Sequence, residues 1–411
     1  MARTAVSPQP DPNAFVIKAT LLLASTLTVM SGATIAPSLP AMQVQFVDIE
    51  NVEFWVRLVL TMPALFIVIG SPIAGQLVDT IGRKPLLLAS AILYGLAGSS
   101  GFVLNSLFAI LGGRALLGLA VAGIMVSATT LIADYYQGDD RANFMGLQAA
   151  FMGFGGVLFL SVGGFIAELN WRFPFLIYLF SWLLLPTIML ALYEPPRPQA
   201  NIEDTTASPQ LSMPIKLLGL IYGSVLLQQI AFYLIPVQLP FHLQQVASVG
   251  ATQTGLAIAC ATLFSALASM RYGKIKQRFS FISILAMGFG LMGLGYVGIG
   301  LVSNYWLVLL ILMPTGIGLG LMMPNLNVWV SNEVPDVMRG RALGGLTTFM
   351  FLGQFLSPIL AQPFSQRIGM TATYGLTGVL LVTLAALVGI FKKQICHFVR
   401  SAVGTAVSPE L

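Results

Sequence analysis

The sequence predicts an all-α membrane protein with twelve transmembrane helices in two pseudo-symmetric six-helix bundles. Hydrophobic residues make up 56% of the 411 residues and charged residues only 9%, whereas soluble domains carry about 25% charged residues. Apolar runs of ~20 residues, the length that crosses a bilayer, recur along the whole chain. An internal repeat relates the two halves. These three observations exclude a water-exposed globular protein.

The apolar runs divide six and six around a polar segment. The spans lie at about 15–40, 54–78, 85–104, 107–133, 145–167 and 173–192, then at about 213–240, 252–272, 281–302, 305–331, 342–366 and 371–391. The segment between the two sets is rich in proline and polar residues, which is typical of a linker. We therefore expect a tail at 1–14, bundles at 15–192 and 213–391 joined by the linker 193–212, and a second tail at 392–411.

The internal repeat is visible in the residues themselves. A shift of about 198 residues aligns the series Arg-x4-Gly-x4-Phe-Met-x2-Gly that begins at Arg141 with the same series at Arg339. Repeats of six spans, an even number, place both halves in the same orientation. The sequence thus predicts two bundles related by an axis along the membrane normal, with a substrate path between them.

The distribution of lysine and arginine predicts the orientation. With the N-terminus inside, all but four of the 20 basic residues lie on the inner side; the four are Arg57, Arg114, Arg172 and Arg367. Basic residues concentrate in cytoplasmic loops. We expect a multi-pass protein of the plasma (inner) membrane with both termini cytoplasmic.

The connection between the second and third spans carries a charged motif, Gly75-Gln-Leu-Val-Asp79-Thr-Ile-Gly82-Arg83-Lys84. Its charges cannot lie in lipid, so they fix one membrane face. The spacing resembles the Gly-x-x-x-Asp-x-x-Gly-Arg-Lys loop of the major facilitator superfamily. This resemblance extends over nearly the whole chain and implies a secondary transporter that works by alternating access.

The motif predicts a conformational latch, because Asp79 at a lipid boundary needs a partner and Arg141 can reach it after the fourth span. The expected latch comprises Gly75, Asp79, Gly82, Arg83, Lys84 and Arg141. Gln277 stands where Asp79 would map in the second half, so the latch is expected on one side only. Alternatively, the basic pair only anchors the topology.

Three charged residues are candidates for proton coupling or for charge in the cavity: Arg114, Asp134 and Arg57. Arg114 begins an Arg-x-x-x-Gly series that resembles the fourth span of the superfamily, where the arginine is associated with proton coupling. It should face the interior, or snorkel to the outer interface. Arg57 follows Glu53 by four residues and either pairs with it or attracts an anionic substrate. By this assignment no acid lies in mid-span, and Asp134 ends the fourth span.

Polar, uncharged side chains within the spans are candidates for the substrate cavity. They are Gln228, Gln229, Asn325, Asn327, Trp329, Gln354 and Tyr178, with Ser127, Thr129 and Thr130 as further candidates. Amides inside a membrane must find partners. Cross-linking of neighbouring helices is therefore the alternative role.

Short loops and the complete motif resemble the drug:proton antiporter branch of the superfamily. That branch carries Gly-Pro-x-x-Gly-Gly in its fifth span, whereas this chain reads Phe159-Leu-Ser-Val-Gly163-Gly164. The resemblance implies export of a small amphipathic or natural-product molecule by proton-coupled antiport. An uptake carrier for a neutral or anionic metabolite is the alternative. A non-transporting sensor or a lipid-translocating protein on the same scaffold is a second alternative.

The sequence gives no indication of an enzyme. It contains no Gly-rich loop that ends in Gly-Lys-Ser/Thr, so ATP is not the expected energy source. Its two histidines and two cysteines are dispersed, so no metal site is expected. We expect no cofactor beyond a proton gradient. The expected partners are a small-molecule substrate and the lipid bilayer, without nucleic acid, and the expected functional unit is a monomer.

Overall fold

The computed structural model describes residues 11–195 and 213–403, and in this part of the chain helices are the only regular secondary structure. Twelve helical segments are long and apolar enough to cross a membrane, which confirms the predicted number. The first six segments are α1 (Phe15–Ala33) with η1 (Ala36–Ser38) and α2 (Leu39–Gln45), α3 (Val52–Ile81), α4 (Arg83–Val103), α5 (Leu107–Tyr135), α6 (Gly138–Leu169), and η2 (Phe173–Leu179) with α7 (Phe180–Leu183) and α8 (Leu185–Leu190).

The second six segments are α9 (Ile215–Ala247), α10 (Ala251–Lys276), α11 (Phe281–Ile299), α12 (Tyr305–Glu333), α13 (Asp336–Ile368) and α14 (Met370–Ile390), followed by the short helix α15 (Lys392–Val403). Helices satisfy every backbone polar group within the segment, which is required in lipid. Two connections consist of one glycine: Gly82 joins α3 to α4 with φ +102°, and Gly369 joins α13 to α14 with φ +83°. Glycine adopts this conformation without strain.

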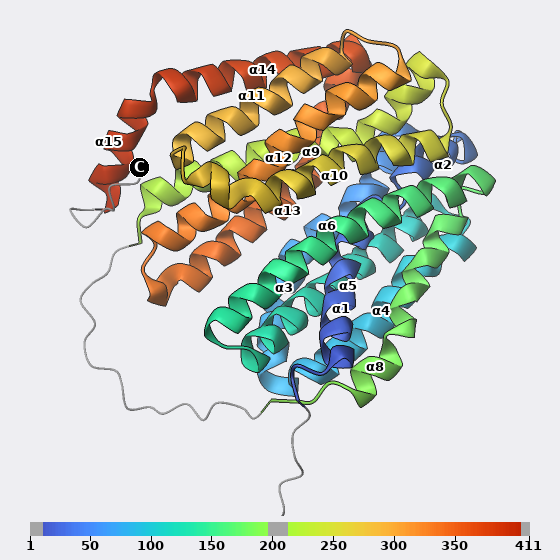
Figure 1. The fold of residues 1–411 in the computed structure, drawn as a ribbon. Coiled ribbons are helices and arrows are strands. Elements are labelled where there is room, and N and C mark those ends of the chain that lie inside the picture. The colour runs from blue at the N-terminus through green and yellow to red at the C-terminus, as the bar shows by residue number, and fades with distance from the viewer. Residues whose placement is uncertain (1–10, 196–212, 404–411) are drawn as a thin grey trace, which may run out of the picture.

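The helices form two bundles, α1–α8 and α9–α15 (Figure 1). Within the first bundle α5 packs on α3 and α4, and α1 packs on α6; within the second, α12 packs on α10 and α11, and α9 packs on α13. The main contacts between bundles are α6 with α10 and α3 with α13. The internal repeat maps α3 onto α10 and α6 onto α13, so these two contacts are pseudo-symmetric equivalents.

The two membrane faces differ in charge. We call basic face the one that carries the α3–α4, α5–α6 and α10–α11 connections, with Arg83, Lys84, Arg141, Lys274, Lys276 and Arg278. The start of the described part of the chain lies there, since the Tyr136 hydroxyl donates to the Pro12 carbonyl at 2.6 Å. So does α15, since the Lys392 ammonium donates to Ser283 Oγ at the start of α11 (2.8 Å). The other face is called the opposite face.

Candidate functional site

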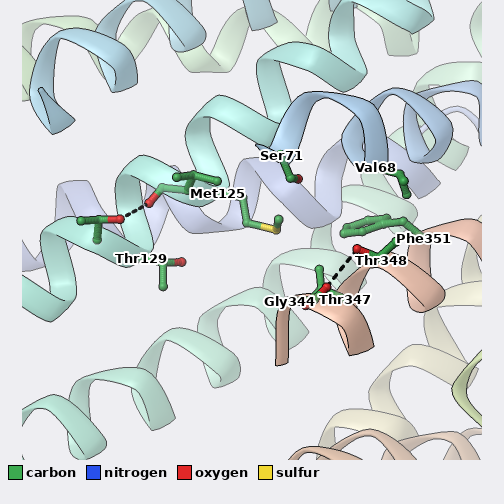
Figure 2. A pocket seen from close by; sticks show the side chains of 10 residues that line it. Val68, Ser71, Met125, Thr129, Gly344, Thr347, Thr348 and Phe351 are labelled. Atoms are coloured by element: carbon green, nitrogen blue, oxygen red, sulfur yellow. Dashed lines mark hydrogen bonds between the residues drawn. The ribbon is translucent and has the colours of Figure 1, made fainter. Parts of the chain in front are cut away.

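A cavity of about 360 Å³ lies between the bundles, on the side of the basic face. Its walls come from α3, α5 and α13, and Figure 2 shows the side chains of α3 and α5 facing those of α13. Five hydroxyl residues line it: Ser71, Thr129, Thr130, Thr347 and Thr348. The remaining lining residues are Val68, Met125, Val126, Gly344 and Phe351. The volume lies within the range of small-molecule pockets, roughly 300–1,000 Å³.

A second cavity of about 180 Å³ extends the first toward α1 and α6. The two share Met125 and Thr129, and the second adds Ser25, Thr28 and Gln148. The amide of Gln148 donates to Ser25 Oγ at 2.7 Å. No Asp, Glu, Lys, Arg or His lines either cavity. The lining of the combined space is therefore uncharged, with hydroxyl groups and one amide among apolar side chains.

Near the opposite face, a buried hydrogen-bond network joins the bundles. Arg57 Nε donates to Gln238 Oε1 (3.0 Å), and Gln238 Nε2 donates to Gln362 Oε1 (3.3 Å). Gln362 Nε2 donates to Glu53 Oε2 (3.0 Å). We call these four residues the inter-bundle network. Arg57, Gln238 and Gln362 are at most 3% exposed, so the network excludes water at this end of the bundle boundary.

The network corrects the simple pairing expected for Arg57. Its Nη1 donates to the backbone carbonyl of Glu53 at 2.7 Å, not to the Glu53 carboxylate. Its guanidinium also lies 4.2 Å from the centre of the Phe241 ring on α9, a favourable cation–π contact. In this conformation the Arg57 guanidinium therefore contacts Gln238 and Phe241 of the second bundle and is not available to an anionic substrate.

Two close backbone approaches extend the contact between bundles at the same end. A Cβ at Gly164 of α6 would lie 2.8 Å from the Ala251 carbonyl oxygen, and one at Gly255 of α10 would lie 2.7 Å from the Leu160 carbonyl oxygen. Nearby, Glu168 Oε2 accepts a hydrogen bond from the backbone N–H of Thr252 at 2.9 Å. A carboxylate at a helix N-terminus is stabilised by the free N–H groups and the helix dipole.

Arg114 is buried at 1% exposure inside the first bundle. It donates to the carbonyls of Val59 (2.9 Å) and Ser31, and to the Tyr178 hydroxyl (2.9 Å). Tyr178 in turn donates to the Ser31 carbonyl at 3.2 Å. Arg114 therefore faces the interior as expected, where it ties α1, α3, α5 and η2 together, and it does not snorkel.

At the basic face, the charged motif forms ion pairs with partners other than the expected one. Arg83 Nε lies 3.0 Å from Asp134 Oδ2, and Arg83 Nη1 lies 4.0 Å from Glu194 Oε1. The backbone N–H groups of Arg83 and Lys84 each donate to the Glu194 carboxylate at 2.8 Å. We call Arg83, Asp134 and Glu194 the basic-face cluster. Arg83 and Asp134 belong to the first bundle, and Glu194 follows its last helix, α8.

The expected pair between Asp79 and Arg141 is not formed in this conformation. Both side chains are exposed, and among the side chains that the structure describes, the ion pairs found in this region join Arg83 to Asp134 and Glu194. The motif glycines differ in their surroundings: a Cβ at Gly82 would lie 2.7 Å from Glu194 Oε1, whereas one at Gly75 would meet nothing within 4 Å. Lys84 Nζ donates to the Met189 carbonyl at 2.8 Å.

The amide and aromatic residues expected in the substrate cavity lie outside the two cavities. Asn325 donates to the Phe281 carbonyl (3.0 Å), and Trp329 stacks on the Phe281 ring at 5.4 Å; both are fully buried in the second bundle. Asn327 donates to the Met323 carbonyl of its own helix (2.9 Å). None of Gln228, Gln229, Asn325, Asn327, Trp329, Gln354 and Tyr178 lines either cavity described above.

Gln228 and Gln229 are buried near the middle of α9. Gln229 Nε2 lies 3.7 Å from Met323 Sδ, and both side-chain polar atoms of Gln228 have no hydrogen-bond partner. Gln354 is half-buried on α13. Ser127 is fully buried in α5. These residues contribute to the interior of the bundles and not to the walls of the two cavities.

Sequence reasoning found Thr129 and Thr130 but missed Ser71, Thr347 and Thr348. The missed residues belong to the same chemical type as those found, short hydroxyl side chains within long apolar spans. Ser71 lies on α3, and Thr347 and Thr348 lie on α13. Because α3 and α13 contact each other across the bundle boundary, hydroxyl residues on these two helices were the available signal.

Twelve spans in two bundles with a cavity between them define a membrane transport protein. The family description that matches the sequence is the Major Facilitator Superfamily, over residues 21–224 and 221–395. The chain belongs to this superfamily. It is a transporter and not an enzyme.

Curated relatives cover most of the chain at low identity. The quinolone resistance protein NorA of Staphylococcus aureus (strain MRSA252) is 24% identical over 326 residues, which cover 79% of this chain and 84% of NorA. The bacillibactin exporter of Bacillus subtilis (strain 168) is 27% identical over 369 residues, which cover 83% of this chain and 88% of the exporter. The similarity to these two proteins agrees with the resemblance to the efflux branch that the charged motif indicated.

Solved structures confirm the fold. The xylose transporter XylE from E. coli, in an inward open conformation, matches with a TM-score of 0.74 at 16% identity, covering 92% of this chain and 96% of XylE. A bacterial homolog of the human lysosomal transporter Spinster, inward-facing and occupied, matches with a TM-score of 0.77 at 16% identity, covering 96% and 99%. At such identities the likeness concerns the fold alone.

Proposed function

We propose that the protein exports a small amphipathic molecule across the plasma membrane by alternating access. One observation carries this proposal: the bundles are joined at the opposite face by buried contacts, while a cavity separates them toward the basic face. A carrier of two bundles around a central path works by rocking one bundle against the other. The conformation described is then the one that admits substrate from the basic face.

The orientation that we propose decides from which side the described cavity is reached. Cytoplasmic loops carry an excess of lysine and arginine, so the basic face, which also bears both ends of the described chain, is cytoplasmic in this proposal. Substrate would enter the cavity from the cytoplasm and leave at the opposite face. The similarity to a protein named as the bacillibactin exporter supports export. Uptake of a metabolite would require the reverse cycle.

We further propose that protons drive the cycle and that Asp134 carries the proton. Every Asp or Glu of the described spanning helices lies in the first or last turn of its helix, so the coupling acid must act from a helix end. Asp134 is paired with the buried Arg83 at 3.0 Å. Protonation of Asp134 would remove the negative charge and release Arg83. Arg114 then has a positioning role, because carbonyls and a hydroxyl already accept its bonds.

The experiment has two stages. First, the extracellular and intracellular metabolites of a deletion strain are compared with those of the parent strain; export predicts that the substrate accumulates inside the deletion strain. Second, the purified protein is placed in proteoliposomes with that substrate, and flux is measured with and without an imposed pH gradient. Accumulation outside the deletion strain would instead establish uptake.

Asp134→Asn and Asp140→Asn form a matched pair for the second stage. Asp140 is an exposed acid at the start of the next helix, α6. We expect Asp134→Asn to lose the response to the pH gradient and Asp140→Asn to keep it. Flux that ignores the gradient in the unmodified protein would contradict proton coupling, and a full response in Asp134→Asn would contradict the role of Asp134.

A further inference from the structure

The cavity between the bundles has a wall of hydroxyl groups whose protons are already used. Ser71 Oγ donates to the Ile67 carbonyl at 2.7 Å, and Thr130 Oγ1 donates to the Val126 carbonyl at 2.8 Å. Each bond links a hydroxyl to the backbone one turn earlier in its own helix, as is common for serine and threonine. The two residues lie on α3 and α5, in the first bundle.

The facing wall from the second bundle shows the same arrangement. Thr347 Oγ1 donates to the Leu343 carbonyl and Thr348 Oγ1 to the Gly344 carbonyl, both at 3.0 Å, and Figure 2 shows the second of these bonds. In the adjoining cavity Thr28 Oγ1 donates to the Ser25 carbonyl at 2.7 Å. Only Thr129 among the five hydroxyl residues of the main cavity has no such bond.

A hydroxyl has one proton to donate and two lone pairs to accept with. When the proton is bound to the backbone, the oxygen can still accept a hydrogen bond from a ligand. The walls of the main cavity therefore offer mainly acceptors. The apolar lining residues Phe351 and Met125 add an aromatic ring and a polarizable thioether, which pack well against aromatic ligands.

The absence of charged residues from both cavity linings adds a second restriction. An anion that entered would lose its hydration without gaining a cation or a set of donors, which is costly in a low-dielectric site. A ligand that has only acceptors would face acceptors. A ligand with N–H or O–H groups finds partners on both bundles, from Ser71 and Thr130 on one side and from Thr347 and Thr348 on the other.

We propose that this cavity selects small, uncharged, partly aromatic molecules that carry hydrogen-bond donors, and that Ser71, Thr130, Thr347 and Thr348 determine this selectivity by accepting those bonds. The inference rests on the proposed transport function, because it takes the cavity as the substrate site. It names the class of substrate, which neither the direction of transport nor the coupling ion determines.

Three fluorescent coumarins that differ in one feature test the proposal. The probe 7-amino-4-methylcoumarin has an uncharged amine with two donors, its 7-dimethylamino analogue has none, and 7-amino-4-methylcoumarin-3-acetic acid adds an anionic group. Binding to the purified full-length protein in detergent is measured by fluorescence titration. We expect the amine to bind about 2- to 10-fold more tightly than the dimethylamine, and the acid to bind most weakly.

Thr347→Val removes the hydroxyl while keeping the shape of the side chain. We expect it to weaken binding of the amine by about 2- to 10-fold and to leave the dimethylamine unchanged. Thr130→Val tests the other wall and serves if Thr347→Val fails to fold. Thr383→Val is the matched control, because Thr383 makes the same kind of bond, to the Val379 carbonyl at 2.8 Å, on the exposed surface of α14.

Three results would overturn the proposal: dimethylamine binding as tight as that of the amine, tightest binding by the acid, or no binding of any probe. An equal loss for amine and dimethylamine in Thr347→Val would reduce the hydroxyl to a packing role. The titration is independent of flux and of the pH gradient. A protein that exports its substrate without donor preference would therefore fail here and pass the transport assay.

Discussion

The two ends of the molecule both carry a buried arginine and a glutamate at a helix N-terminus, but they use these groups differently. At the opposite face Arg57 bonds to Gln238 of the other bundle, and Glu168 of α6 accepts from the first turn of α10. At the basic face Arg83 pairs with Asp134, and Glu194, just after α8, accepts from the first turn of α4; none of these contacts reaches the second bundle. Contacts that cross the bundle boundary must break when the bundles rock, whereas contacts within a bundle can persist.

This difference gives each end a separate expected role. The contacts at the opposite face set how readily that face opens, since they exist in one conformation only, and a change in their free energy shifts the population of conformations. In this conformation the basic-face cluster stabilises the first bundle, and its Arg83–Asp134 pair is the one that we propose to break on protonation during the cycle. The experiments below separate the two roles by measuring opening and thermal stability in the same variants.

Arg57→Met should have the largest effect on opening. It removes a charge-assisted hydrogen bond to Gln238 and the contact with Phe241, and hydrogen bonds to charged groups contribute about 1.5–3 kcal/mol. The population that is open at the opposite face should rise roughly 10- to 150-fold. The reporter is a cysteine at Thr61, which is fully buried one helical turn beyond Arg57, in a C260A/C396A background, labelled by a membrane-impermeant maleimide from outside the cell.

The control for this reporter is the same cysteine with the native Arg57. Labelling of Thr61→Cys should be slow with Arg57 present and fast with methionine in its place. Equal rates would show that the inter-bundle network does not hold the opposite face closed.

Gly164→Ala should open the same face by steric pressure. The added methyl would lie 2.8 Å from the Ala251 carbonyl oxygen and 3.0 Å from Gly255 Cα, and both are backbone atoms that cannot rotate away. Overpacking of this kind costs about 1–3 kcal/mol, so the labelling rate of Thr61→Cys should rise roughly 5- to 150-fold.

Gly146→Ala in the same helix is the matched control, because its Cβ would meet nothing within 4 Å. It should leave the labelling rate unchanged. If both alanines accelerate labelling alike, the cause is a change in α6 itself and not the contact with α10.

How much of this architecture the sequence could predict depends on the range of each interaction. The twelve spans follow from local length and hydrophobicity, and the structure confirms their number. The cost of an arginine in lipid predicted correctly that Arg114 faces the interior. Both arguments need only the residue and its immediate neighbours along the chain.

The partners of the charged residues could not be predicted in the same way. Sequence distance suggested Glu53 for Arg57, but the folded chain brings up Gln238 from 181 residues away. Likewise the expected pair joined Asp79 to Arg141, whereas the ion pairs of this region join Arg83 to Asp134 and Glu194. The lining of the two cavities could not be predicted for a related reason. Amides are the most polar uncharged groups in the spans, yet Asn325 of α12 bonds to the Phe281 carbonyl of α11, while hydroxyl groups line the cavity between the bundles.

Glu168→Gln and Glu194→Gln test the comparison with one chemical change at both ends. Glutamine keeps one oxygen, which can accept the Thr252 N–H bond at position 168 but only one of the two N–H bonds at position 194. It also removes the charge that interacts with the helix dipole, an effect of about 0.3–1 kcal/mol. Glu168→Gln should raise the labelling rate of Thr61→Cys about 2- to 5-fold. Glu194→Gln should instead lower the thermal unfolding temperature by a few degrees without changing labelling.

Labelling is the control measurement for Glu194→Gln, and thermal unfolding in detergent is the control measurement for Glu168→Gln. Faster labelling in Glu194→Gln would mean that the basic-face cluster also controls the opposite face. The division between crossing and internal contacts would then not hold.

Asp79→Asn should have the smallest effect on the conformation described here. The Asp79 side chain is exposed and takes no part in the ion pairs of the described residues. The unfolding temperature of Asp79→Asn, and its labelling rate at Thr61→Cys, should therefore match those of the parent protein. Transport should nevertheless fall about 2- to 5-fold, because a carboxylate at a helix end that binds a partner in only one conformation stabilises that conformation by differential affinity. Arg141→Gln should lower transport by a similar factor if Arg141 is that partner. The measurement is flux in proteoliposomes at equal protein amounts. Unchanged transport in both variants would leave Asp79 and Arg141 as topology anchors. A loss in Asp79→Asn alone would point to a partner on the second bundle, so that a contact at the basic face would cross the bundle boundary in the other half of the cycle.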